Sequence, residues 1–201
     1  MKENFIEKLN RNKILPIIRS KDPQDVIDKS HALLDGGIDI VEINVETPQI
    51  FKAIEELSKE MTVCAGGIIT SMQAQAAIDC GAKIISSPIF QTNLLKISKD
   101  KRLPFIAGTS TANEAYSAWK ARIPLVKIYP ITAMGGVQYI ENLLRPMPFL
   151  KIIPQGDVKL EEVKDYIKLG AVAVGVGRHL TKTTTYSEIT QKTKRLLETL
   201  N

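Results

Sequence analysis

The sequence predicts a parallel eight-stranded (β/α)8 barrel, the TIM-barrel class of α/β fold, with a short helix ahead of the first strand. Short apolar runs alternate with segments of helical spacing from one end of the 201-residue chain to the other. Each run is apolar almost throughout, as in strands of a parallel sheet that helices cover. Eight such units of roughly 25 residues favour a closed barrel, since closure leaves no edge strand. They use up the chain, so we expect residues 1–201 to form a single barrel domain.

The predicted strands follow one another at regular intervals. In chain order they are Ile14–Ile18, Ile40–Ile43, Thr62–Ala65, Ile84–Ser86, Pro104–Ala107, Leu125–Tyr129, Leu150–Ile153 and Ala171–Val174. An amphipathic segment after Asn4 is the expected N-terminal helix, and apolar residues at helical spacing predict helices between strands. Three helices also carry start signals, in which a capping residue precedes proline or stands three positions before glutamate. These pairs are Asp22 with Pro23, Thr47 with Pro48, and Thr111 with Glu114.

The composition is that of a globular protein and excludes several classes of function. Lysine and arginine exceed aspartate and glutamate by 27 to 22, and the basic residues are scattered. Only 5% of residues are aromatic, so no basic cluster with interleaved aromatics predicts a nucleic-acid partner. No apolar run approaches the ~18–20 residues that a bilayer span needs, and two cysteines cannot build a disulfide framework or a four-ligand zinc site. We expect a cytoplasmic protein with no membrane partner.

A weak internal repeat marks every second β–α unit. Gly37, Gly81 and Gly170 each follow a helical pattern and precede a strand, as glycine does at a helix C-terminus. The first two are 44 positions apart and the last two are 89, close to two such steps. A fourth copy, residues 120–127, lacks the glycine. The period therefore marks strands 2, 4, 6 and 8.

The fifth residue after each marker belongs to one predicted layer inside the barrel. Alternate strands of an eight-stranded barrel contribute their inward side chains to a common layer of four. The four residues are Glu42, Ser86, Lys127 and Gly175. Glu42 and Lys127 are expected to face each other near the C-terminal mouth, where barrel active sites lie. Two positions back, Ile40, Ile84, Leu125 and Ala173 form a predicted floor.

A lysine and a glutamate at this depth suit Schiff-base chemistry. Burial favours the neutral form of the Lys127 amine, which can add to a ketone and make an imine. Glu42 would move protons between substrate, water and carbinolamine. This chemistry requires neither a metal nor an organic cofactor. The alternatives are a lysine that extends to solvent and a purely structural Lys–Glu pair.

The residues resemble the class I aldolases that cleave 2-keto-3-deoxy-6-phosphogluconate and 4-hydroxy-2-oxoglutarate, the KDPG/KHG aldolases. The segments that carry the resemblance are 41–48 around Glu42, 64–68, 86–88, 126–130 around Lys127, 135–140 and 173–177. The resemblance implies a homotrimeric barrel of carbohydrate metabolism whose lysine, Lys127, forms a Schiff base with pyruvate while Glu42 is the general acid/base. It also implies substrate-binding positions at Arg19, Gly66, Gly67 and Pro88. The alternative for Arg19 is a surface salt bridge.

Several positions depart from the family pattern. Glu46 is an acid where some members carry arginine, and Gly67 replaces a threonine that contacts the pyruvate unit. The family binds phosphate at a Gly-Gly turn after strand 7 and a Gly-Ser turn after strand 8, through backbone N–H groups. Here these turns read Gly156-Asp157 and Gly177-Arg178.

Two readings of this altered anion site remain open. Arg178 pairs with Asp157 and fills the phosphate pocket, so that the substrate is unphosphorylated or differently shaped. Alternatively, Arg178 reaches the anion directly while Asp157 points to solvent. The complementary charges favour the first reading, and His179 is expected to be packed or exposed rather than a ligand or base.

Two function classes follow from these observations. The first is a cofactor-independent class I aldolase that cleaves a 2-keto-3-deoxy (phospho)sugar acid, such as 2-dehydro-3-deoxy-6-phosphogluconate, to pyruvate and an aldehyde. The second is a repurposed, catalytically weak barrel that binds an anionic metabolite, which the altered turn and Gly67 support.

Overall fold

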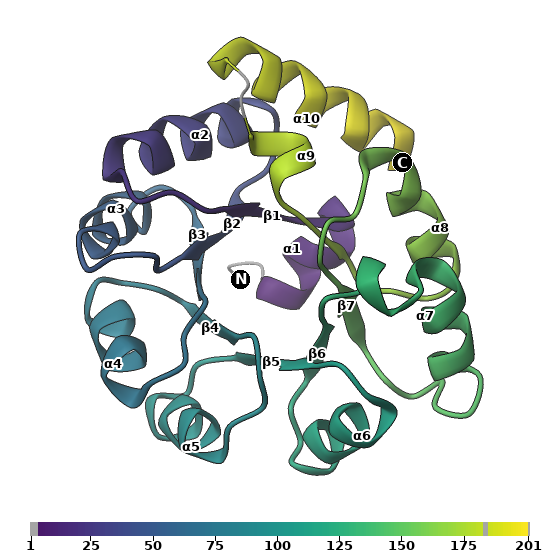
Figure 1. Cartoon of the computed structure of the whole chain (residues 1–201). Helices are drawn as coiled ribbons and strands as arrows, with labels where there is room; N and C mark the ends of the chain where they lie inside the picture. The colour runs from purple at the N-terminus through teal and green to yellow at the C-terminus, as the bar shows by residue number, and fades with distance from the viewer. Residues whose placement is uncertain (1–3, 183–184, 201) are drawn as a thin grey trace.

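The computed structural model describes residues 4–182 and 185–200, in which eight parallel strands surround a common axis and helices cover their outside (Figure 1). The strands are β1 Ile14–Ile18, β2 Ile40–Asn44, β3 Thr62–Gly66, β4 Ile84–Ser87, β5 Phe105–Thr109, β6 Leu125–Ile128, β7 Ile152–Pro154 and β8 Val174–Val176. From β1 to β7 each strand pairs with the next along the chain, and β8 returns to pair with β1. The prediction of a (β/α)8 barrel is confirmed.

Helices alternate with the strands, and most of them form an outer ring around the barrel, whereas the N-terminal helix lies near the barrel axis (Figure 1). They are α1 Phe5–Asn12, α2 Pro23–Asp35, α3 Ile50–Leu57, α4 Ser71–Asp79, α5 Thr92–Lys101, α6 Ala112–Lys120, α7 Gly136–Leu144, α8 Val163–Lys168, α9 Arg178–Thr181 and α10 Tyr186–Leu200, with short 3-10 turns at Thr132–Met134 and Leu160–Glu162. None of the helices within the described ranges combines the length and apolar character needed to cross a membrane.

The N-terminal helix α1 lies at the end of the barrel where the strands begin. Its Lys8 and Arg11 side chains both form ion pairs with Asp39, which directly precedes β2. Its Leu9 side chain is fully buried. The helix therefore lies at the end opposite the mouth, so that a ligand reaching the predicted Glu42–Lys127 layer would enter from the C-terminal ends of the strands.

The seam between β7 and β8 closes with fewer contacts than the other strand pairs. One isolated parallel bridge joins Gln155 to Gly175, and the Val172 N–H donates to the Ile152 carbonyl at 3.0 Å. The barrel is thus closed at this seam by one bridge just past the end of β7 and one hydrogen bond from just before the start of β8.

Strand 8 begins later than the apolar run predicts. The run starts at Ala171, whereas β8 starts at Val174. The N–H groups of Gly170 and Ala171 are still bonded to carbonyls of α8, and the first bond on the β1 side, from the Val174 N–H to the Lys13 carbonyl, comes only afterwards. Similarly, Leu150 still belongs to the turn before β7. The end of α8 and the turn before β7 therefore take up the first residues of these two apolar runs.

The predicted start signals differ in how closely they mark the first helical residue. Asp22 caps α2, and Thr111 forms a capping box with Glu114 at α6, as predicted. Helix α3 begins at Ile50, two residues beyond Pro48. The N–H groups of residues 50–52 donate to carbonyls three positions back, so residues 47–52 form tighter turns than an α-helix has.

The repeated marker positions share one backbone conformation. Gly37, Gly81 and Gly170 have φ of 102°, 94° and 100°, the left-handed region that favours glycine. In the copy without glycine, Arg122 occupies the same position and takes φ 63°. The two-unit period is therefore a period of backbone conformation, which the fourth copy keeps with a different residue.

Candidate active site

The pairing of the strands decides which side chains point into the barrel. Residues paired across neighbouring parallel strands point to the same side of the sheet. Glu42 on β2 pairs with Ile17 and Cys64 on its two neighbours. Lys127 on β6 pairs with Gly108 and Ile153. Because side chains alternate along a strand, Gln155, two residues after Ile153, points inward as well.

Lys127 and Glu42 meet inside the barrel, as the repeat predicts. Lys127 Nζ lies 2.8 Å from Glu42 Oε1 and 2.9 Å from Oε2. Only 2% of Lys127 and 1% of Glu42 is exposed. The predicted floor residues of the layer below are also buried, namely Ile40, Ile84, Leu125 and Ala173. A buried pair in this geometry can pass a proton from the ammonium to the carboxylate without changing its net charge.

Close packing around Glu42 holds its carboxylate toward Lys127. A Cβ atom added at Gly66 would lie 2.7 Å from both Cγ and Oε1 of Glu42, closer than real contacts allow. On another side, Gln155 Nε2 donates to Glu42 Oε1 at 3.5 Å. Glycine at position 66 is therefore required for the carboxylate to occupy its place.

Cys64 lies in a part of the barrel interior that is shielded from solvent. Its thiol is fully buried beside the pair, and burial raises its pKa well above the usual range, with the charge of Glu42 adding to the effect. The thiol stays protonated at neutral pH, so it does not compete with the Lys127 amine as a nucleophile.

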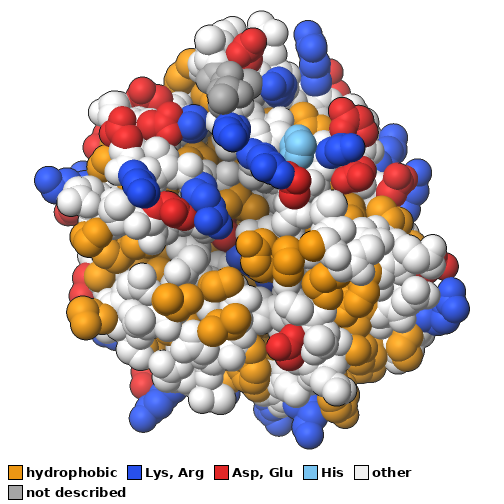
Figure 2. Space-filling model, viewed as in Figure 1, with side chains coloured by type: hydrophobic (Ala, Val, Ile, Leu, Met, Phe, Trp, Pro, Cys, Tyr) orange, Lys and Arg blue, Asp and Glu red, His pale blue; other side chains and the backbone are white. Residues whose placement is uncertain are grey.

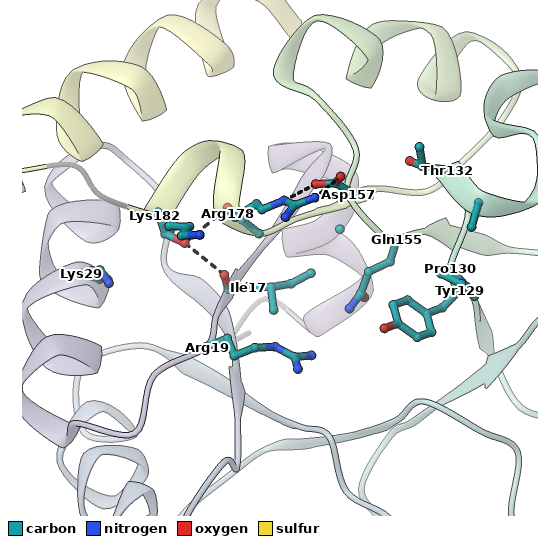
Figure 3. A pocket seen from close by; sticks show the side chains of 15 residues that line it. Ile17, Arg19, Lys29, Tyr129, Pro130, Thr132, Gln155, Asp157, Arg178 and Lys182 are labelled. Carbon is teal, nitrogen blue, oxygen red and sulfur yellow. Dashed lines mark hydrogen bonds and ion pairs between the residues drawn. The ribbon is translucent and has the colours of Figure 1, made fainter.

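A cavity of about 740 Å³ opens at the mouth of the barrel, on the side of β1, β7 and β8. Figure 3 shows Arg19, Tyr129 and Gln155 pointing into the same space. Figure 2 shows Lys and Arg side chains gathered on the upper side of the mouth and hydrophobic side chains on the other sides.

Five of the predicted binding residues line the cavity: Arg19, Gly156, Asp157, Gly177 and Arg178. Gln155 and Gly175 also line it, and Gln155 reaches Glu42, so these residues connect the cavity to the buried pair.

Arg19 reaches over the mouth and contacts the side chains of Glu46 and Asn44. Its Nη1 atom lies 3.3 Å from Glu46 Oε1. With its amide oxygen turned toward the guanidinium, Asn44 accepts from Arg19 Nη2 at 2.8 Å. Glu46 is therefore turned toward the mouth, and its negative charge is balanced by Arg19.

Arg178 and Asp157 form the contact that the first reading of the anion site requires. The guanidinium donates through Nε and Nη2 to the two carboxylate oxygens of Asp157 (Figure 3). The His179 Nε2 atom lies 2.9 Å from Asp157 Oδ1. The hydrogen bonds from Arg178 lower the pKa of the Asp157 carboxyl, with a further contribution from His179. Asp157 takes φ 61°, so the turn keeps a glycine-like conformation although it carries a carboxylate. His179 is half-buried and contacts this acid.

The remaining predicted positions lie at the ends of their strands. Gly66 ends β3 and is followed by Gly67 with φ 70°, while Pro88 directly follows β4. Gly66 contacts Glu42, as described, whereas Gly67 and Pro88 do not line the cavity in the described part of the chain. Sequence reasoning did not single out Gln155. The signal in the sequence was a polar residue two positions after the inward-facing Ile153. An apolar side chain is expected there if the strand continues.

The side chains in the described part of the chain offer no candidate metal centre. Within residues 4–182 and 185–200, no group of three or more His, Cys, Asp or Glu side chains is placed to hold a metal ion.

Comparison with known proteins gives consistent matches. The family model described as KDPG and KHG aldolase matches residues 5–195. The chain is 27% identical to a 2-dehydro-3-deoxy-phosphogluconate aldolase of Haemophilus influenzae, covering 98% of this chain and 96% of that protein. It is 26% identical to the KHG/KDPG aldolase of Escherichia coli K12, covering 82% and 78% of the two chains. A crystal structure of KDPG aldolase from Legionella pneumophila, with pyruvate captured as a covalent carbinolamine, matches the fold with a TM-score of 0.87 at 24% identity, covering 98% and 99%.

The buried pair predicts a strong coupling between its two members. Lys127→Met leaves a buried carboxylate without its counter-charge, and Glu42→Leu leaves a buried ammonium, so each should lower the free energy of unfolding by about 3–5 kcal/mol. The double variant removes both charges and should lose much less than the sum. Urea unfolding followed by circular dichroism measures all three. Additive losses would show that the two charges are not coupled.

Proposed function

Because the chain belongs to the KDPG and KHG aldolase family, we propose that it is a class I aldolase that cleaves a 2-keto-3-deoxy acid into pyruvate and an aldehyde through an imine at Lys127. The observation that carries this proposal is the contact between Lys127 Nζ and both carboxylate oxygens of Glu42 inside the barrel. The amine and the acid/base that imine chemistry needs are thus already side by side.

The first half of the reaction forms the imine. Glu42 takes a proton from the Lys127 ammonium along the existing hydrogen bond, and the neutral amine adds to the C2 ketone of the substrate. Glu42 then protonates the hydroxyl of the carbinolamine, which leaves as water. The pair and the neighbouring Cys64 thiol are buried, so bulk water is largely kept from the amine before attack.

The second half breaks the carbon–carbon bond. Glu42 accepts the proton of the C4 hydroxyl, the C3–C4 bond breaks, and its electron pair moves through C2 onto the iminium nitrogen. The aldehyde leaves, and the enamine that remains on Lys127 is protonated at C3. Water then adds to the pyruvate imine and releases pyruvate with the free amine. One carboxylate thus moves each proton in turn.

Arg19 is the proposed partner of a substrate carboxylate. Its guanidinium reaches over the cavity, and its planar fork can bind a carboxylate through two hydrogen bonds. Glu46 and Asn44 hold the guanidinium in place.

For the far end of the substrate, we propose that an unphosphorylated acid is favoured over a phosphorylated one. The hydrogen-bond donors of Arg178 are directed at Asp157, and Asp157 brings negative charge to the turn where a phosphate would bind. Gly156 and Gly177 lie beside this pair, so their backbone groups are proposed as minor contacts only.

We further propose that the protein acts in the cytoplasm as a homotrimer. An exposed apolar patch, defined as Ile69, Met72 and Ile89, supports an association between copies. Gln91 Nε2 donates to the Ile69 carbonyl at 3.1 Å and so ties together the two loops that carry the patch.

Borohydride trapping tests the imine directly. With pyruvate, the unchanged protein should gain a reduced adduct on Lys127, identified by peptide mass spectrometry. Lys127→Met should give none, while Glu42→Gln should keep some imine yet slow turnover by ~10²–10⁴.

The control for trapping is a known class I aldolase labelled in parallel. If it is labelled and this protein is not, the mechanism is wrong. Thermal stabilisation by pyruvate without an adduct would instead favour the second function, a barrel that binds an anionic metabolite without cleaving it.

The closed anion site predicts a change of preference when Asp157 is replaced. Asp157→Gly suits the positive φ and frees Arg178 for a phosphate. The ratio of kcat/KM for 2-dehydro-3-deoxy-6-phosphogluconate to that for the unphosphorylated acid should rise by about 10- to 100-fold, the range for a hydrogen bond to a charged group. Asp157→Asn, which keeps the shape without the charge, should raise it less. An unchanged ratio in both variants contradicts the proposal.

Sedimentation equilibrium tests the assembly. The unchanged protein should sediment as a trimer, and Met72→Glu, which puts a charge into the apolar patch, should shift the population toward monomers. A monomeric unchanged protein at micromolar concentration would refute the trimer.

A further inference from the structure

A second cavity lies at the end of the barrel where the strands begin, away from the mouth. It has a volume of about 560 Å³ and is formed by the turns that lead into β6 and β7, the end of α6 and Ile6 of α1. In the described part of the chain it shares no lining residue with the mouth cavity. Sites for small molecules occupy about 300–1,000 Å³, so this second cavity has room for such a ligand.

Aromatic rings form one wall of the second cavity. Trp119 of α6 and Phe149 of the turn before β7 line it, and the centres of their rings are 4.4 Å apart. Tyr116, one helical turn before Trp119, stacks on the indole with ring centres 5.7 Å apart. Each of the three side chains is between 41% and 43% exposed. Single exposed apolar residues are ordinary on a protein surface, whereas a cluster of large ones marks a place where something binds.

Three cations line the same cavity, namely Lys120, Arg122 and Lys151. Across residues 4–182 and 185–200, no aspartate or glutamate lines it, and none of the three cations has an acidic side chain as a partner. The Lys120 Nζ atom instead lies 5.8 Å from the centre of the Tyr116 ring. At the mouth, by contrast, two arginines are paired with acids. The positive charge of the second cavity is therefore available to an anion.

The rings and the cations together select one chemical class of ligand. An aromatic wall alone can attract ammonium compounds, but three cations beside it repel them. The guanidinium of Arg122 can bind a carboxylate or a phosphate through two hydrogen bonds, and Lys151 adds a point charge. A flat ring covers the exposed edges of Trp119 and Phe149 and gains from aromatic contact with them.

We propose that the second cavity binds a small organic anion, whose aromatic ring packs against Trp119 and Phe149 and whose carboxylate or phosphate contacts Arg122 and Lys151. This site is independent of the aldolase reaction, because it lies at the opposite end of the barrel from the mouth. Trp119 is the one tryptophan of the chain, so tryptophan fluorescence reports on this cavity alone.

Four phenyl compounds separate the contributions of ring and charge. Phenylacetate and phenyl phosphate are anions, 2-phenylethanol is neutral and 2-phenylethylamine is a cation. Each is titrated into the full chain while Trp119 is excited at the red edge of its absorption, where phenyl groups do not absorb. The anions should change the emission saturably, and the tighter one identifies the anionic group. The neutral compound should bind about 10- to 100-fold more weakly, the range for a hydrogen bond to a charged group, and the amine should not bind.

Two variants remove the cations that the anion contacts. Arg122→Gly suits the φ of 63° at this turn, where the other three copies of the repeat carry glycine. Lys151→Met keeps the length of an exposed side chain. Each should weaken the binding of phenylacetate by about 10-fold or more. Lys83→Met is the matched control, because Lys83 directly precedes β4 as Lys151 directly precedes β7, and it should bind phenylacetate like the unchanged protein.

Four results would overturn the inference. The first is no saturable response to either anion, and the second is equal affinity for phenylacetate and 2-phenylethanol. The third is an affinity that neither Arg122→Gly nor Lys151→Met lowers. The fourth is an emission of Trp119 that changes with protein concentration alone, which would place a second copy of the chain over the aromatic wall. A chain that binds phenylacetate here but traps no pyruvate would contradict the proposed function and leave this site standing.

Discussion

The ion pair between Lys127 and Glu42 is the constraint on which the rest of this barrel depends. Moving two charges from water into a protein interior costs several kcal/mol for each ion, and only close contact with additional hydrogen bonds offsets that cost. The barrel supplies these conditions through Gly66, which leaves room for the carboxylate, and Gln155, which donates to it. An arrangement that costs stability and yet is packed this closely is typical of a site kept for its chemistry.

Charge at the mouth is organised differently from charge in the interior. Two of the cations that line the cavity are held by acids on nearby segments: Arg19 by Glu46, and Arg178 by Asp157. These contacts are partly exposed, so they contribute little to stability. Their effect is on recognition, because an incoming anion must compete with a carboxylate that is already in place. We therefore expect the rim of the cavity to discriminate between ligands by their charge.

The sequence predicted the strands, the barrel and the facing positions of Glu42 and Lys127, because these depend on local apolar runs and on a period of backbone conformation. The period held even where Arg122 replaces glycine, since the turn geometry and not the residue type repeats. The Arg178–Asp157 contact followed from complementary charges on adjacent loops. Gln155 was not found, because its contact with Glu42 and its fit against Gly175 both involve residues on other strands. Such features depend on side-chain packing across the barrel, which no local pattern records.

The mutual fit of Gln155 and Gly175 has a consequence for how this barrel can change. Because the glutamine occupies the volume in front of the glycine, any larger residue at position 175 requires a shorter one at position 155. A side chain cannot be introduced at position 175 while Gln155 stays as it is, so a change at position 175 must be paired with one at position 155. Libraries that vary one position at a time would miss every variant that combines a larger residue at position 175 with a shorter one at position 155.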